Sequence, residues 1–121
     1  EVINFADHRI AQLQGFGARY FVPQLTLSRA VALRKLGRLD EASAALDLAR
    51  RAAQEIGLRL TLLLTLLETI ELAKQVEEVQ RANESRQAAK EIIRFISDHI
   101  DEPALRASFQ NLPQIRSVLA A

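Results

Sequence analysis

The chain has 121 residues, a formal net charge of +1, and no cysteine, methionine or tryptophan. Because 16 basic residues balance 15 acidic ones, the chain has no strong net field to attract a nucleic-acid backbone or an anionic membrane. The lack of cysteine excludes disulfides, thiol nucleophiles and cysteine-ligated metals. At 49% hydrophobic residues, the chain is the size of one globular domain, and the lack of methionine leads us to expect a piece of a longer protein.

The most apolar stretch runs from Leu58 to Leu67 and is interrupted by Arg59, Thr61 and Thr65. It is shorter than the roughly 20 residues that a membrane-spanning helix needs. No signal peptide is visible. We therefore expect a cytoplasmic protein that makes no membrane contact.

Helical periodicity dominates the sequence, and no stretch alternates apolar and polar residues as a half-buried strand does. We predict an all-α fold with glycine and proline at the helix boundaries. The least marked boundary lies near residue 76, so residues 58–100 form either one long helix or two. The predicted helices are Val2 to Gln14, Arg19 to Leu36, Asp40 to Ile56, Leu58 to Gln75, Val79 to Ile100, Pro103 to Gln110 and Pro113 to Ala120.

The turn between the second and third helices is only a few residues long, which predicts an antiparallel helix hairpin. Gly37 suits the left-handed position that ends a helix, and Asp40 offers a side-chain acceptor for the N-cap of the next helix, which Gly57 ends. The apolar faces of this hairpin exceed what one hairpin can bury, so we expect further hairpins to stack on it. The predicted core comprises Ala30, Leu33, Leu36, Ala42, Leu46, Ala49, Leu62, Leu63, Leu66, Leu67, Ile70, Ile92, Ile93 and Ile96.

The segment from Leu36 to Ala42 resembles the central "LGxxxEA" turn of a tetratricopeptide repeat (TPR). Ala30 and Leu33 match two positions of the first helix of that repeat, and Leu46 and Ala49 match two positions of the second. The resemblance implies a TPR-like right-handed α-solenoid of stacked antiparallel hairpins.

Two positions depart from the family pattern, since Thr26 stands where a large residue is usual and Gln54 stands near a frequent proline. The resemblance divides the single domain into four parts. Residues 1–17 are similar to the second helix of a truncated repeat, residues 18–56 to the best-formed repeat, and residues 57–100 to a degenerate repeat. Residues 101–121 form a short C-terminal helical cap.

The tail, residues 95–116, resembles the end of TPR arrays at the C-terminus of large bacterial multidomain proteins. Those proteins carry NTPase, nucleotide cyclase, kinase or LuxR-type regulator modules. The resemblance implies a non-enzymatic sensor or docking region for protein–protein interaction in signalling, with catalysis in other modules. The alternative is a structural terminal cap or self-association element of the parent repeat array.

The inner helices of such a stack line a concave groove, where a protein or peptide segment of a partner binds. Leu27 and Val31 occupy the places where carboxylate-clamping TPR domains carry lysine and asparagine, so that mode of binding is excluded. Further expected partners are upstream repeats of the parent chain and a second copy, through the N-terminal helix. The predicted groove residues are Gln24, Leu27, Val31, Arg34 and Lys35 on one helix, with Thr61, Thr65, Glu68 and Thr69 on the next.

Catalytic and cofactor motifs are absent from the sequence, including phosphate-binding glycine loops and zinc-protease patterns. The sequence neighbours Asp98, His99, Asp101 and Glu102 are interpreted as a helix end and cap, because adjacent helical residues point about 100° apart and do not converge on a metal. We expect no metal, no cofactor and no enzymatic activity. Nucleic acid is not an expected partner, since the arginines are interspersed with acids and aromatic residues are few.

Overall fold

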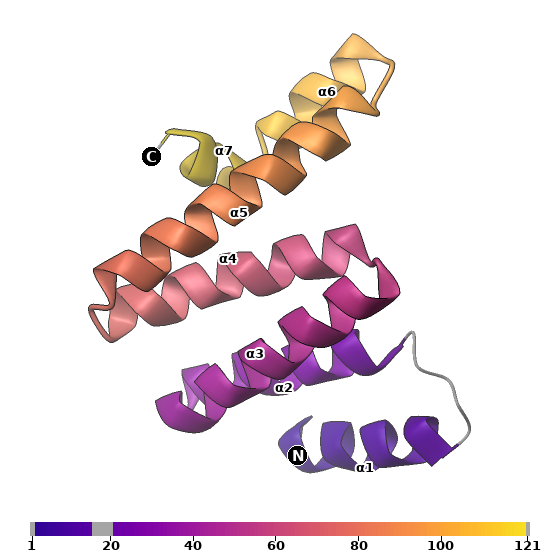
Figure 1. Ribbon diagram of the computed structural model, residues 1–121, viewed down its shortest axis with the longest axis vertical. Helices are drawn as coiled ribbons and strands as arrows, with labels where there is room; N and C mark the ends of the chain where they lie inside the picture. Colours follow the sequence, from indigo (N-terminus) through magenta and orange to yellow (C-terminus); the bar gives the residue numbers. More distant parts are fainter. Residues whose placement is uncertain (1, 16–20, 121) are drawn as a thin grey trace.

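The computed structural model describes residues 2–15 and 21–120, with the side chains of residues 3–10 and 21–120. These ranges form seven α-helices and no strand, which confirms the all-α prediction for them. Residues 58–100 form two helices, and the predicted helix start at Arg19 lies outside the described residues. The helices are α1 (Val2–Gly15), α2 (Val22–Lys35), α3 (Leu39–Ile56), α4 (Arg59–Gln75), α5 (Val79–Asp98), α6 (Pro103–Gln110) and α7 (Pro113–Ala120) (Figure 1).

Consecutive helices pack against one another in chain order. The most extensive helix contacts join α2 to α3 and α4 to α5, which are the two complete hairpins. Contacts of α1 with α2 and of α3 with α4 link these hairpins to their neighbours. Figure 1 shows the resulting layers from α1 to α5, with α6 and α7 beside α5.

The contact between α2 and α3 is built on small side chains. Ala30, Ala42 and Ala49 have no exposed surface, and methyl side chains allow two helix backbones to approach closely. Leu33 and Leu46 are also buried in this contact. One side chain each from α1 and α4 joins the same cluster, so the first hairpin is held from both sides.

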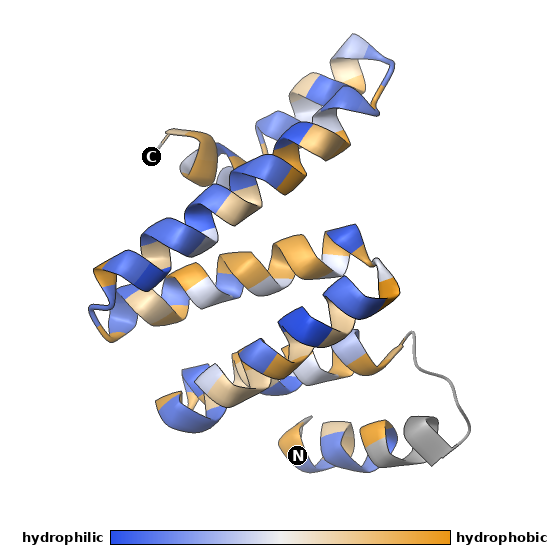
Figure 2. Ribbon diagram, viewed as in Figure 1, coloured by the Kyte–Doolittle hydropathy of each residue, from blue (hydrophilic) through white to orange (hydrophobic). Residues whose placement is uncertain are grey.

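A second core cluster joins α4, α5 and α7. It contains Leu63, Leu66 and Ile70 of α4, and α7 adds Ile115 and Val118. Helix α4 packs between neighbouring helices, and in Figure 2 it has the most continuous apolar colouring of all the helices drawn. None of the helices in the described part of the chain combines the length and apolar character that crossing a bilayer requires.

The predicted core is correct except at Leu36, with four of its members only half-buried. Leu36 is 61% exposed, because it caps α2 at the tip of the hairpin, where the chain reverses and no described element covers it. The half-buried members pack against the second cluster. They are Leu62, Leu67, Ile92 and Ile96.

The turn between α2 and α3 has the hydrogen bonds of a Schellman motif. Gly37 has a φ of 79°. A residue with a side chain would be sterically strained in this backbone conformation. The Gly37 amide donates to the Arg34 carbonyl at 3.0 Å, and the Arg38 amide donates to the Leu33 carbonyl at 2.9 Å. The predicted role of this glycine is confirmed, as is the left-handed end of α3 at Gly57, with a φ of 86°.

The start of α3 differs from the prediction. Arg38, not Asp40, holds the N-cap position, and it makes no side-chain capping bond. Asp40 and Glu41 lie in the first turn, where carboxylates interact favourably with the helix dipole. Arg38 donates two hydrogen bonds to the Glu41 carboxylate, at 2.9 and 2.7 Å, and this contact lowers the pKa of Glu41.

The turn between α4 and α5 repeats the same geometry without a glycine. The Glu77 amide donates to the Lys74 carbonyl at 3.3 Å, and the Glu78 amide donates to the Ala73 carbonyl at 2.8 Å. Glu77 has a φ of 60°, which makes it the only non-glycine residue with positive φ in the described ranges. The second turn therefore holds an L-residue in a left-handed conformation.

The two hairpins are related by a shift of 40 residues, the difference between Gly37 and Glu77. The same shift relates eight of their buried positions, although most of the residue types differ. The chain therefore contains an internal structural repeat. Buried residues Pro23, Thr26, Ala30, Leu33, Ala42, Ala45, Ala49 and Ala53 correspond to Leu63, Leu66, Ile70, Ala73, Ala82, Ser85, Ala89 and Ile93, all buried as well.

We expect Glu77→Gly to raise the free energy of unfolding by about 1 kcal/mol, because it removes the strain of a left-handed L-residue from an exposed turn. Gly37→Ala is the matched opposite change and is expected to lower the unfolding free energy by about 1 kcal/mol. Urea unfolding followed by circular dichroism measures both. A destabilised Glu77→Gly variant would contradict the assignment of the second turn.

Candidate functional site

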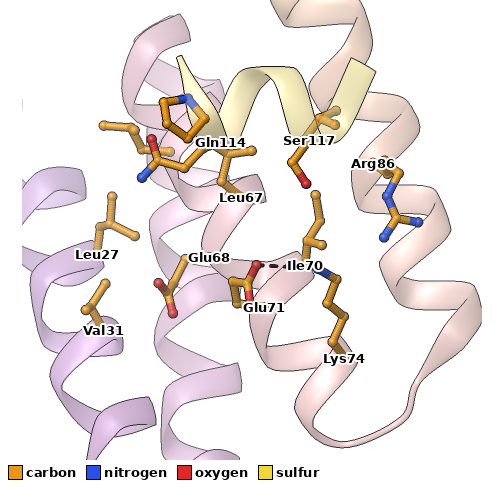
Figure 3. A pocket seen from close by; sticks show the side chains of 13 residues that line it. Leu27, Val31, Leu67, Glu68, Ile70, Glu71, Lys74, Arg86, Gln114 and Ser117 are labelled. Atoms are coloured by element: carbon orange, nitrogen blue, oxygen red, sulfur yellow. Dashed lines mark ion pairs between the residues drawn. The ribbon is translucent and has the colours of Figure 1, made fainter. Parts of the chain in front are cut away.

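A cavity of about 600 Å³ lies between α2, α4 and α7. Figure 3 shows Leu27 and Val31 on the α2 side, with Gln114 and Ser117 of α7 across the cavity. Residues of α4 lie between these two walls, and Arg86 of α5 lines the same cavity. The remaining lining residues are Leu64, Leu67, Glu68, Ile70, Glu71, Lys74, Pro113 and Val118.

The apolar part of this groove is accessible. Leu64 is 45% exposed, and Leu27, Val31 and Leu67 are half-buried. Leu27 also packs against the first core cluster, whereas Leu64 belongs to neither cluster. The groove therefore offers partly exposed aliphatic side chains from two helices to an incoming group.

The predicted groove residues Arg34 and Glu68 bind each other across α2 and α4. The Arg34 guanidinium donates to both oxygens of the Glu68 carboxylate. Their side chains are only 22% and 13% exposed. Arg34 therefore already contacts a carboxylate of its own chain, that of Glu68. The pair ties α2 to α4 along the groove.

The prediction that Thr61, Thr65 and Thr69 line the groove is wrong. All three are buried, and the Thr65 and Thr69 hydroxyls donate to the backbone carbonyls four residues earlier, each at 2.8 Å. Thr69 lines a different crevice, together with Asp47 and Arg50 of α3. Thr69 therefore points away from the groove, and neither Thr61 nor Thr65 lines it.

The internal repeat identifies the α4 residues that the sequence analysis missed. A shift of 40 residues carries Leu27 onto Leu67 and Arg34 onto Lys74, and both targets line the cavity. The same shift carries Gln24 to residue 64 and Val31 to residue 71, which also line it. Copying the α2 pattern onto α4 at this spacing would have found the correct face.

Charged groups lie around the apolar part of the groove. Lys74 and Glu71 form an exposed ion pair at 3.6 Å (Figure 3). Arg86 donates to the Asn83 amide oxygen at 2.8 Å. Because asparagine is neutral, this hydrogen bond does not balance the positive charge of Arg86. Lys35 is exposed one helical turn after Val31 on the same face of α2.

Two other predictions fall outside this groove. Gln24 is exposed on the first turn of α2 but does not line the cavity. His99 caps the end of α5, stacks on the Phe95 ring at 4.1 Å, and lies with Nδ1 2.7 Å from the Phe95 carbonyl oxygen. Across the described residues, no three or more His, Asp or Glu side chains gather in a way that could hold a metal ion.

Comparison with known proteins gave no matching family model, curated protein or solved structure. Aliphatic side chains, an amide, a hydroxyl and two cations can bind a polypeptide segment through apolar contact and hydrogen bonds.

We expect Arg34→Met to lower the free energy of unfolding by roughly 1–2 kcal/mol, because it leaves the mostly buried Glu68 carboxylate without its donor. Lys74→Met breaks the exposed pair with Glu71 and is expected to cost less than about 0.5 kcal/mol. Urea unfolding of both variants tests this difference. Equal stability of the two variants would show that the Arg34 contact does not join α2 to α4.

Proposed function

We propose that the chain is a non-enzymatic protein–protein interaction module that binds a partner segment in the groove between α2, α4 and α7. The observation that carries this proposal is the accessible aliphatic surface of Leu64, Leu67 and Val31 inside a concave cavity. Water-exposed apolar groups in a concavity favour binding, since covering them removes apolar area from water.

The proposal includes a TPR-like right-handed solenoid. Its support is the TPR-like segment from Leu36 to Ala42 at the tip of the first hairpin, together with the alanine contact beneath it. The internal period of 40 residues, from Gly37 to Glu77, is longer than the roughly 34 residues of a consensus repeat. Longer helices account for part of this difference, since α3 has 18 residues and α5 has 20.

The groove chemistry favours a segment with aliphatic side chains flanked by acidic ones. Leu27, Val31 and Leu64 supply the apolar contacts, and Arg86 supplies positive charge in the cavity lining. Lys35 does not line the cavity but is exposed one helical turn after Val31. A cavity of about 600 Å³ holds a few large side chains and not an entire helix. The partner segment is therefore proposed to insert two or three apolar side chains.

The wider role is proposed from the resemblance of the tail to bacterial multidomain regulators. In that role the chain is the C-terminal sensor or docking region of a larger cytoplasmic signalling protein, and catalysis belongs to other modules. Binding at the groove would then change the activity of those modules.

A second candidate function is a structural cap or self-association element. It is favoured by α7, whose Ile115 and Val118 are each only 4% exposed and cover the hairpin of α4 and α5. A repeat array needs such a closing element to shield its last apolar face. The two functions are compatible, because α7 packs on this hairpin through Ile115 and Val118 and also contributes Gln114 and Ser117 to the groove.

We expect Leu64→Glu and Val31→Glu to reduce partner affinity by at least about tenfold, because each places a carboxylate in a desolvated apolar contact. Leu48→Glu is the matched control, since Leu48 is 55% exposed on α3 and does not line the cavity. Proteins captured from the source cells identify the partner, and calorimetry with its purified binding fragment gives the affinities. Equal affinity for all three variants would remove the groove as the binding site.

A further inference from the structure

The first helix occupies a definite place in the internal repeat. The shift of 40 residues carries α1 onto α3 and Asp7 onto Asp47. Asp7 binds Arg29 of α2, with 2.6 Å between Oδ1 and Nε. The shifted pair, Asp47 and Thr69, lines one crevice between α3, α4 and α5. Helix α1 therefore packs on α2 as α3 packs on α4.

In each complete hairpin, the first helix covers one face of the second helix. In this way α2 covers a face of α3, and α4 covers a face of α5. On α3 this face holds Ala45 and Ala49, which are 1% and 0% exposed. Ala45 belongs to the same core cluster as residues of α2. On α5 the equivalent residues are Ser85 and Ala89, 8% and 0% exposed, and Ala89 clusters with α4.

On α1 the equivalent face is open. The shift carries Ala45 and Ala49 onto Phe5 and Arg9, and Phe5 is 61% exposed. The Arg9 guanidinium carbon lies 5.9 Å from the centre of the Phe5 ring. In Figure 1, α2 lies on one side of α1 and no described helix lies on the opposite side.

We propose that this open face is a docking site for one more α-helix, supplied by the same polypeptide ahead of Glu1 and antiparallel to α1. The internal repeat identifies the occupant, because α2 and α4 cover the equivalent faces of α3 and α5. The repeat also indicates that this helix comes from the same polypeptide. Moving the turn at residues 36–38 back by 40 residues places it directly ahead of Glu1. A covalently attached helix reaches the face through a turn like those at residues 36–38 and 76–78. This site is independent of the groove.

The face also defines the chemistry of the docking helix. Phe5 is larger than its counterpart Ala45 in the first hairpin. The helix that packs on Phe5 therefore needs small residues opposite the ring. Arg9 replaces a second alanine, so this position also needs more room than its counterpart Ala49 on α3. The occupant is thus an amphipathic helix with alanine or glycine facing Phe5.

The test adds a copy of residues 21–40 directly before Glu1, which keeps the 40-residue register. The copied segment carries Leu33→Ala to leave room for the Phe5 ring. A second chain combines the unaltered copy with Phe5→Ala and Arg9→Ala, which restores the side chains found on α3. In the control, the copied equivalent of Ala30 is changed to aspartate (Ala30→Asp). This change places a charge in the contact between the added helix and α1. Hydrogen exchange and thermal melting are measured for all chains.

We expect the added helix to dock in at least one of the two chains, with its amides protected about tenfold or more relative to the control and with a higher Tm. Unprotected amides in both chains would overturn the proposal. Light scattering on the unextended chain tests the competing occupant. A dimer that Phe5→Asp dissociates would assign the face to a second copy and overturn a helix from the same polypeptide, whereas a monomer supports the proposal.

Discussion

The close approach of α2 and α3 over alanine side chains is the contact on which the rest of this structure depends. Ala30 and Ala42 have no exposed surface and leave no volume for larger groups. This contact fixes how α2 is rotated within the first hairpin, and it therefore fixes which side chains of α2 remain free. Leu27 and Val31 line the groove because their neighbours on the helix are committed to α3.

The second hairpin reproduces this arrangement with different residues. Ile70 and Ala73 take the places of Ala30 and Leu33, so volume moves from one buried position to another while both stay buried. Such exchanges are tolerated when the total volume of a core is kept. The repeated register puts equivalent faces of α2 and α4 side by side, and the Arg34–Glu68 contact then joins them along the groove.

The sequence predicted the helices well because glycine and proline mark most boundaries. Pro103 and Pro113 each begin a helix as expected, and Gly37 ends α2 with the expected left-handed backbone. The boundary at Glu77 was harder to predict, because a non-glycine residue adopts the same conformation there. Alanine and leucine spacing identified most of the core, since that spacing reflects helix contacts directly.

The groove was predicted only in part. The polar threonines of α4 suggest an exposed face, but the Thr65 hydroxyl donates to the Thr61 carbonyl of the same helix, and Thr65 is fully buried. On a helix surrounded by neighbours, polarity is a poor guide to exposure. The α7 wall, with Gln114 and Ser117, could not be predicted, because it depends on how the chain folds back after α5.

The most direct test of the account is methyl NMR of the leucine- and valine-labelled chain, with and without the binding fragment of its partner. If the partner segment binds in the groove, we expect shift changes for the methyl groups of Val31, Leu64 and Leu67, which line it. The methyl groups of Leu48 and Val79, which are exposed outside it, should stay unchanged. Shift changes confined to Leu48 and Val79 would contradict the account.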